Sequence, residues 1–439
     1  MKKTCSVAFI LFAMLVTGGS GRCESVITFV PRLTLAEEYT DNVDLDPKDK
    51  REEWTTVLSP GFDLDMLWKT RSLRLSYTPG FAYAAKDDAN SEIRQDLLLG
   101  YKDQLSKSLR VSAIETLQRT ELPYTVQDPV FQRQVEEETG RRRDRTIRRN
   151  REPYTESTTR VAMDYTFGAR DRLNVAYIFG ILDNDDPTVE DNHRHNPRVS
   201  MTVWPWDHYG IDAGILYERG EYSGKTDYTD DTEAYVRFLR EFSQHLNGFV
   251  GYRHTVSQSI GNTRDYRVYE PFIGVDWESS KDFFASVSLG YFYKENDVGS
   301  NDSGPTLSGD VGKSWRFRRG AVRLTGGTGY EQSYGGAENL GFTVFYRAGL
   351  AASYALAKHV DSIASVSVER NEYLDEDPER DDNTYTFSGT LRYQMRRWLF
   401  WNLAYIYQQV DSNLNDNDYT ENRVMMSVSL IPPHGLRYK

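Results

Sequence analysis

The sequence predicts an all-β fold, a single up-and-down antiparallel β-barrel that crosses a membrane. Apolar residues recur at every second position along most of the chain, and short links alternate with long ones between these segments. Tyr, Phe and Gly are also abundant, at 29, 20 and 32 of 439 residues. A period of two is typical of strands with one apolar face, and regularly spaced segments of this kind build one hairpin-connected sheet.

The first residues predict export from the cytoplasm. Lys2 and Lys3 precede an apolar run from Val7 to Val16, and small residues follow at 18–21. This three-part pattern is typical of a secretory signal, so we expect residues 1–22 to be a signal peptide and residues 23–439 to form the barrel. A lipoprotein alternative would attach lipid at Cys23, although Arg22 stands where that processing favours a small residue.

The strands are predicted from the alternating segments in chain order. Even-numbered residues are mostly apolar from Trp54 to Trp68, and odd-numbered residues are apolar from Leu73 to Ala85. The same alternation returns at 161–167, 173–181, 283–293, 342–354 and 401–407. We expect about twenty strands, with eighteen as the alternative if the terminal segments do not pair. The number is expected to be even, because both termini of such barrels lie on the periplasmic side.

The links alternate in length along the whole chain. Short links are predicted at 69–71, 168–171, 205–208, 279–281, 318–320, 356–358 and 395–397. Long polar links are predicted at 41–53, 86–92, 182–196, 220–232, 295–305, 371–383 and 411–422. Short periplasmic turns and long extracellular loops are typical of bacterial outer-membrane barrels. We therefore predict a multi-pass barrel in the outer membrane of a Gram-negative bacterium, in contact with the lipid bilayer and lipopolysaccharide and inserted by the barrel assembly machinery.

The two faces of the predicted strands differ in chemistry. A charge on the lipid face near the middle of the bilayer costs roughly 2–4 kcal/mol, so charged residues of the alternating segments are expected to face the lumen. Aromatic residues near the strand ends are expected in interfacial belts: Trp54, Trp68, Trp204, Trp206, Trp277, Trp315 and Trp401. The candidate lumen-lining residues are Asp63, Asp65, Arg74, Arg160, Asp164, Glu233, Tyr235, Arg237, Arg253, Glu270, Asp276, Asp310, Arg316, Arg323, Glu331 and Arg392.

One segment, residues 121–152, interrupts the alternation. It is an unusually long link, and such links are commonly functional or disordered. The candidate constriction residues in it are Arg141, Arg142, Arg143, Arg145, Arg148 and Arg149. Folded into the lumen, their guanidinium groups would bind carboxylates or phosphates of a solute. Two alternatives remain open: an outer position against lipid phosphates, and a solvated charged loop.

Composition and motifs argue against other function classes. The net charge of −12 disfavours nucleic acid as a partner. Residues 23–439 contain no G-x-S-x-G motif, and Leu307 stands where a phosphate-binding loop before Lys313 needs its first Gly. His193 and His195 are expected in a solvated loop without rigid metal geometry. We therefore predict no enzymatic activity, no metal and no cofactor.

Three short stretches carry a family resemblance: Tyr39–Val43, Leu58–Phe62 and Arg148–Tyr154. They resemble the Putative beta-barrel porin 2 family, which is associated with exopolysaccharide gene clusters. The resemblance implies a conduit for polysaccharide export, with a periplasmic polysaccharide-export protein as a candidate partner. The alternatives are a general or anion-favouring diffusion porin for small solutes and a structural barrel without transport.

Overall fold

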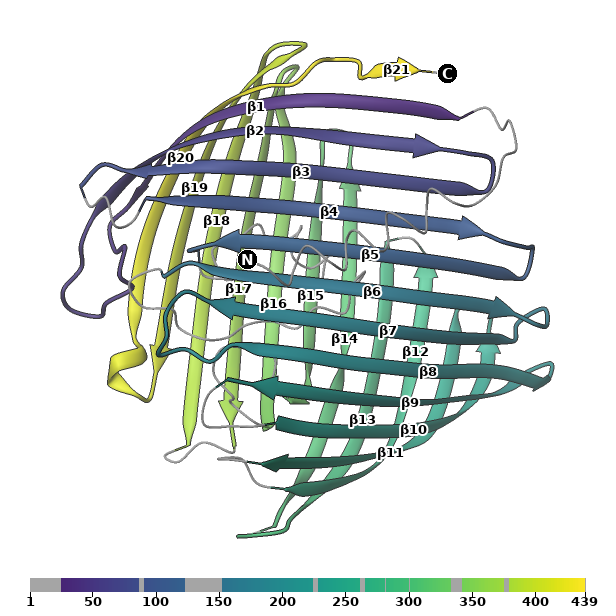
Figure 1. Ribbon diagram of the computed structural model, residues 1–439. Coiled ribbons are helices and arrows are strands. Elements are labelled where there is room, and N and C mark those ends of the chain that lie inside the picture. Colours follow the sequence, from purple (N-terminus) through teal and green to yellow (C-terminus); the bar gives the residue numbers. More distant parts are fainter. Residues whose placement is uncertain are drawn as a thin grey trace.

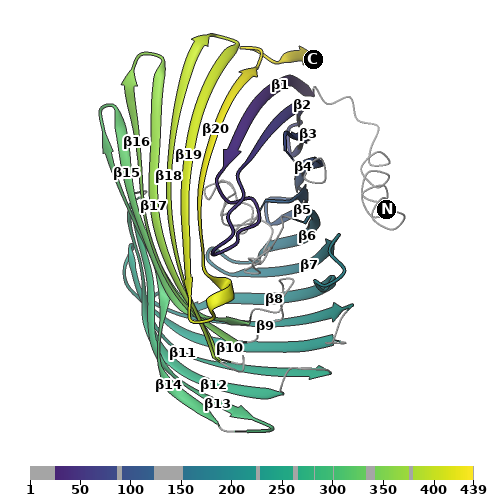
Figure 2. The ribbon, with the colours of Figure 1, turned by 90° about the vertical axis from the view of Figure 1, so that its left-hand side faces the viewer.

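The chain forms a closed antiparallel barrel of twenty spanning strands, as predicted (Figures 1 and 2). The computed structural model describes residues 25–86, 91–122, 152–223, 228–260, 265–280, 282–299, 301–332, 342–374 and 379–438. Each strand from β1 to β19 pairs with the next one in the chain, and β20 pairs with β1 to close the sheet. Closure leaves no strand edge with unpaired backbone groups, which a lipid environment requires.

The strand bounds follow the alternating segments of the sequence. The first ten strands are β1 Val26–Thr40, β2 Glu53–Leu67, β3 Arg71–Ala84, β4 Glu92–Gln104, β5 Leu109–Thr120, β6 Tyr154–Thr166, β7 Arg172–Asn184, β8 Asn192–Trp206, β9 Tyr209–Tyr222 and β10 Tyr228–Ser243. The others are β11 Leu246–Ile260, β12 Tyr266–Ser280, β13 Phe283–Asn296, β14 Asp302–Phe317, β15 Gly320–Gln332, β16 Phe342–Ala357, β17 Val360–Tyr373, β18 Arg380–Arg396, β19 Leu399–Ser412, β20 Tyr419–Leu430 and the short β21 Leu436–Tyr438. A 3-10 turn, Asn415–Asn417, precedes β20, and none of the helices in the described ranges is long and apolar enough to cross a membrane.

The short strand β21 completes the barrel seam at its C-terminal end. Both β20 and β21 pair with β1, β20 along Leu33–Thr40 and β21 along Ile27–Phe29. Pro432 and Pro433 lie between them, and proline cannot donate a hydrogen bond to a neighbouring strand. The last strand is therefore interrupted, and β21 resumes pairing along the same edge of β1.

Short and long links alternate around the barrel, but the long links are shorter than the sequence predicts. The link predicted at 182–196 spans only residues 185–191, because β7 continues to Asn184 and β8 begins at Asn192. The link predicted at 220–232 is also shorter, since β9 ends at Tyr222 and β10 begins at Tyr228. A strand needs only about 9–11 residues to cross a bilayer. Beyond the hydrocarbon, polar residues continue the backbone pairing, so polarity does not mark the strand end.

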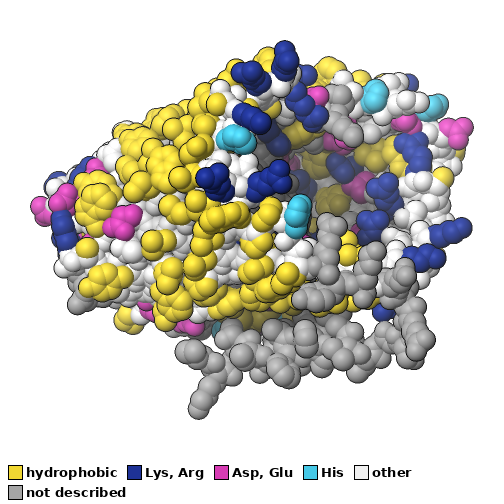
Figure 3. Space-filling model, turned by 90° about the horizontal axis from the view of Figure 1, so that it is seen from above, with side chains coloured by type: hydrophobic (Ala, Val, Ile, Leu, Met, Phe, Trp, Pro, Cys, Tyr) yellow, Lys and Arg dark blue, Asp and Glu magenta, His cyan; other side chains and the backbone are white. Residues whose placement is uncertain are grey.

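The outer face of the barrel is apolar. Alternate residues such as Leu35, Leu58, Phe81, Ile215 and Ile273 are exposed along it. Trp206, Trp277 and Trp315 are exposed near the short turns and Trp54 near the long links, where an aromatic ring suits a membrane interface. Figure 3 shows the broad apolar surface beside a hollow lined by charged side chains.

Trp204 does not belong to the predicted outer belt. Its ring packs against an inward-facing cluster of Leu239, Phe249 and Phe272, and Arg170 lies over it at 3.6 Å. Trp204 is an even-numbered residue of β8, whereas the exposed Val199 and Met201 are odd-numbered. The strand alternation therefore places Trp204 on the inner face.

The outer register also fails at the start of β16. The sequence pattern places Phe342 on the lipid face, but Phe342 is fully buried against Tyr266, Phe292 and Tyr330. The pairing of β15 with β14 ends at Thr328, opposite Gly309, whose φ is +155°. Beyond this point the β15–β16 hairpin leaves β14, and its aromatic side chains pack over the inner wall.

Glu115 of β5 is a carboxylate on the outer face, in the middle of a strand. It pairs in register with Thr159 of β6, two residues from the exposed Val161. The hydroxyls of Ser157 and Thr159 both donate hydrogen bonds to Glu115, the first at 2.7 Å. These bonds satisfy the carboxylate beside the exposed apolar side chains of the outer face.

Candidate functional site: the inner wall of the barrel

The described candidate lumen residues lie on the face opposite the exposed apolar side chains. In β2, Asp63 and Asp65 alternate with Leu64 and Met66, and Arg74 pairs in register with Asp65. On β6, Arg160 and Asp164 alternate with the exposed Val161 and Tyr165. The same alternation places the following side chains on the inner face: Glu233, Tyr235, Arg237, Arg253, Glu270, Asp276, Asp310, Arg316, Arg323 and Arg392.

Two arginines on neighbouring strands each bind two carboxylates. Arg237 of β10 donates to Asp212 at 2.7 Å and lies 3.7 Å from Asp276. Arg253 of β11 contacts Glu270 at 3.1 Å and Glu233 at 3.6 Å. Each guanidinium is thus held between strands, which fixes its position against the wall.

The Arg253 cluster extends across five strands. Tyr330 of β15 donates a hydrogen bond to Glu270 at 2.6 Å, and Thr306 of β14 donates another at 2.9 Å. Glu270 is almost completely buried, so these donors and Arg253 replace the water that its charge would otherwise need. Sequence alternation could place Glu270 on this face, but it could not reveal Tyr330, which reaches Glu270 only because the β15–β16 hairpin folds inward.

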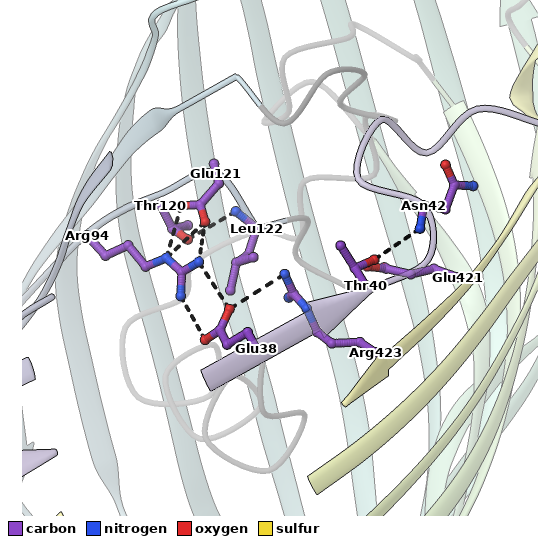
Figure 4. A network of polar contacts seen from close by, with 9 residues as sticks. All are labelled: Glu38, Thr40, Asn42, Arg94, Thr120, Glu121, Leu122, Glu421 and Arg423. Carbon is purple, nitrogen blue, oxygen red and sulfur yellow. Dashed lines mark hydrogen bonds and ion pairs between the residues drawn. The ribbon is translucent and has the colours of Figure 1, made fainter. Parts of the chain in front are cut away.

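A second network joins the first and last strands at the barrel seam (Figure 4). Arg94 of β4 binds Glu38 of β1 at 2.9 Å and also binds Glu121, just beyond β5. Arg423 of β20 lies 3.8 Å from Glu38. Thr40 of β1 donates to Glu421 of β20 at 2.7 Å. Side chains from four places in the chain therefore reinforce the backbone pairing that closes the barrel.

The link 41–52 folds back against the inner wall. Leu45, with a φ of 54°, is fully buried against Val410 and Tyr419, which face inward from β19 and β20. Asn42 donates to the backbone carbonyls of Asp46 and Thr420. This link therefore narrows the mouth at the long-link end of the barrel, a role that the sequence suggested only for residues 121–152.

Polar contacts fix the outer end of this link. Asp41 accepts hydrogen bonds from the backbone and side chain of Asn422, both at 2.7 Å. At the rim, Lys86 and Tyr39 donate hydrogen bonds to Glu52, and these bonds hold the pKa of the Glu52 carboxyl below its usual range.

The charged side chains differ between the two halves of the lumen. At the long-link half, Glu38, Glu270, Lys294 and Glu421 are buried. Nearer the short turns, Arg74, Arg323 and Arg392 are exposed, and within the described ranges no carboxylate forms an ion pair with any of them. Arg392 instead lies over the ring of Phe400 at 4.4 Å.

Several predicted features lie outside the described residues. They include the signal peptide, 1–22, and the candidate constriction residues Arg141, Arg142, Arg143, Arg145, Arg148 and Arg149. Glu331 falls within β15, but its side chain is also outside the description. The two ends of the Arg-rich link are described: Glu121 is buried and bound to Arg94, and Glu152 is exposed.

The predicted histidine loop is a strand. His193 and His195 belong to β8, and His195 Nδ1 lies 2.6 Å from the hydroxyl of Tyr177 on β7. In the described part of the chain, no three His, Cys, Asp or Glu side chains are placed to share a metal ion.

A comparison with known families identifies what the second half of this barrel resembles. Residues 239–431 match the family model Putative beta-barrel porin 2. The match confirms the family resemblance over residues 239–431, which are the end of β10 and all of β11–β20, whereas the three stretches that carry the resemblance in the sequence lie before this range. Together with the closed barrel and its apolar outer face, the match supports an outer-membrane β-barrel of porin-like architecture.

A solved structure supports the fold. The apoprotein form of the FrpB iron transporter from Neisseria meningitidis is 11% identical, with a TM-score of 0.51 over 92% of this chain and 81% of that chain. The siderophore receptor PirA from Pseudomonas aeruginosa is 10% identical, with a TM-score of 0.49 over 92% and 80% of the two chains. OpdK from Pseudomonas aeruginosa with vanillate is 10% identical, with a TM-score of 0.41 over 92% and 99%. A search of curated proteins found no match.

Proposed function

We propose that this barrel is a conduit for polysaccharide export across the outer membrane of a Gram-negative bacterium. The observation that carries the proposal is the inner wall, where charged and hydroxyl side chains follow the lumen from one end to the other. A barrel of about twenty strands encloses more space than its own side chains fill. A wall of this chemistry offers a hydrated polymer many exchangeable hydrogen bonds without a deep apolar pocket that would retain it.

The pairing of charges in the long-link half supports the same proposal. Arg253 and Arg94 are each bound by carboxylates of the wall. A guanidinium that is already paired binds a passing anion less strongly than a free one. Sugar hydroxyls can still exchange hydrogen bonds with the outer atoms of these groups, so this half suits passage better than capture.

Reconstitution of the full chain in planar bilayers and liposomes tests the proposal. We expect open channels and liposome swelling with neutral oligosaccharides well above the size that a small-solute porin admits. Swelling with monosaccharides alone would instead support the second candidate, an anion-favouring diffusion porin, which the exposed basic residues near the short turns favour. No conductance from a folded barrel would support the structural barrel without transport.

The partners follow from the same proposal. We expect the bilayer and lipopolysaccharide around the barrel, the barrel assembly machinery during insertion, and a periplasmic polysaccharide-export protein at the short-turn end. We expect no catalytic activity, since a conduit needs no reacting group.

A further inference from the structure

We propose that the short-turn half of the lumen binds an acidic polysaccharide, and that unpaired arginine side chains of the wall hold its carboxylates. The inference rests on the proposed function and deepens it by naming the class of polymer. It starts from the contrast between the two halves of the lumen.

The arginines of the long-link half are already engaged by the protein. The side chain of Arg94 is 13% exposed and lies between Glu38 and Glu121. Arg253 lies between Glu233 and Glu270. Their charges are balanced by carboxylates of the wall, so these residues serve the barrel itself.

The basic residues of the short-turn half are available to a ligand. Arg74 is the fourth residue of β3 and Arg323 the fourth of β15, and Arg392 lies near the end of β18. All three side chains are exposed in a hollow part of the barrel. Four more basic side chains face inward and form no ion pair within the described residues: Lys102, Arg110, Arg160 and Arg172.

These side chains come from opposite walls. Arg74, Lys102, Arg110, Arg160 and Arg172 lie on β3–β7, whereas Arg323 and Arg392 lie on β15 and β18. In a closed sheet of twenty strands, β5 and β15 are half a circumference apart. A polymer in the lumen is therefore exposed to guanidinium groups on two sides, and Figure 3 shows basic side chains around the hollow.

Acidic side chains of this half do not cancel the basic charge. Asp65 and Arg74 are register partners, as are Asp361 and Arg392, and Asp164 and Arg110, yet in the described structure none of these pairs comes within ion-pair distance. The seven basic side chains named above exceed these three carboxylates, and Arg237 binds two further carboxylates of the same half, Asp212 and Asp276. An exposed guanidinium offers two parallel N–H donors, which match the two oxygens of a uronate carboxylate.

The charged residues of the links also differ between the two ends of the barrel. Basic residues lie in the short turns, at Lys69, Lys107, Arg318, Arg319 and Arg397. The described long links are rich in acid, with Asp185, Asp186, Glu190 and Asp191 between β7 and β8, and Asp416 and Asp418 before β20. In the described links, basic side chains at the short-turn mouth outnumber Asp171, Asp207 and Asp282, so these charges attract an anionic polymer to that mouth.

Block of the channel current by polymers tests the site. Oligogalacturonate is the acidic probe, and dextran of matched length is the neutral probe, each added to the full-length barrel in a planar bilayer. We expect oligogalacturonate to block at far lower concentration than dextran. In the triple variant Arg74→Gln, Arg323→Gln, Arg392→Gln, the half-blocking concentration of oligogalacturonate should rise about tenfold, since each exposed pair contributes a modest amount.

A matched control separates the lumen site from the charge of the mouth. The variant Arg318→Gln, Arg319→Gln, Arg397→Gln removes the same charge from the short turns, outside the strands, and should change the half-blocking concentration less than about twofold. The single variant Arg323→Gln gives a second measurement if the triple variant does not fold, with a smaller rise expected.

Three results would overturn the inference: equal block by dextran and oligogalacturonate, no change in the lumen variants, or an equal change in the control. In each of them a conducting barrel that passes neutral oligosaccharides would leave the proposed conduit intact. A folded barrel without conductance would instead overturn the proposed function itself.

Discussion

At the residue scale, Arg94 shows how buried charge closes the barrel. Its guanidinium is the shared partner of Glu38 on β1 and Glu121 beyond β5. Both carboxylates are less than a tenth exposed. Because an unpaired buried charge destabilises a fold, Arg94 stabilises the barrel by neutralising these two carboxylates.

We expect Arg94→Gln to destabilise the barrel by about 3–5 kcal/mol, since Glu38 and Glu121 then remain buried and only Glu38 keeps a nearby arginine, Arg423 at 3.8 Å. The measurement is the urea midpoint of the reconstituted barrel, followed by heat-modified mobility in gels. Arg172→Gln, which removes an exposed arginine with no ion pair in the described structure, is the control and should leave the midpoint unchanged. Equal midpoints for the two variants would show that the seam network does not stabilise closure.

At the element scale, glycines allow aromatic rings to lie flat on the inner wall. Gly274 of β12 stands beneath the ring of Phe249 on β11, and Gly251 of β11 stands beneath Phe272 on β12. A Cβ at Gly274 would lie 2.4 Å from both the Phe249 ring and the carbonyl oxygen of Val287. The rings of Phe249 and Phe272 meet edge to face with centroids 6.0 Å apart, a favoured geometry for such pairs.

Gly274→Ala should therefore destabilise the barrel by about 1–3 kcal/mol, because either the ring or the backbone of β13 must move. Gly100→Ala on β4 is the matched control, since nothing lies within 4 Å of its added Cβ. Thermal unfolding in detergent, followed by circular dichroism, compares the two. A transition for Gly274→Ala that coincides with that of Gly100→Ala would mean that the ring packing is not constrained.

At the scale of the whole molecule, the lumen must be narrowed for the membrane to remain a barrier. The link 41–52 narrows it at one end, with Leu45 buried against the wall. The Arg-rich link 121–152 is the predicted second element, and its first residue is already held inside by Arg94.

Deleting residues 132–149 should raise single-channel conductance and reduce anion selectivity while leaving the barrel folded, because it removes both bulk and the arginine cluster. The readouts are conductance and reversal potential in a salt gradient. A folded deletion variant with the parent values of both would place this link at the outer surface.

The alternation along β2, β6 and β12 was enough to predict the fold, because side chains of a strand point to opposite faces with a period of two. A lipid environment forbids charge on one of those faces, so Asp63, Arg160 and Glu270 could be assigned to the inner face from the sequence. The even strand number followed from the alternation of short and long links.

Only the tertiary structure decided which inner charges are paired. Arg253 and Arg323 look equivalent in the sequence, yet Arg253 is held by two carboxylates and Arg323 is exposed. Ion pairs depend on strand register and on the side chains that neighbouring strands place beside each arginine. The inward position of Phe342 and Tyr330 also required tertiary structure, since it follows from the end of β14–β15 pairing at Gly309. Local periodicity determines the face of a side chain, whereas its partners come from residues far away in the chain.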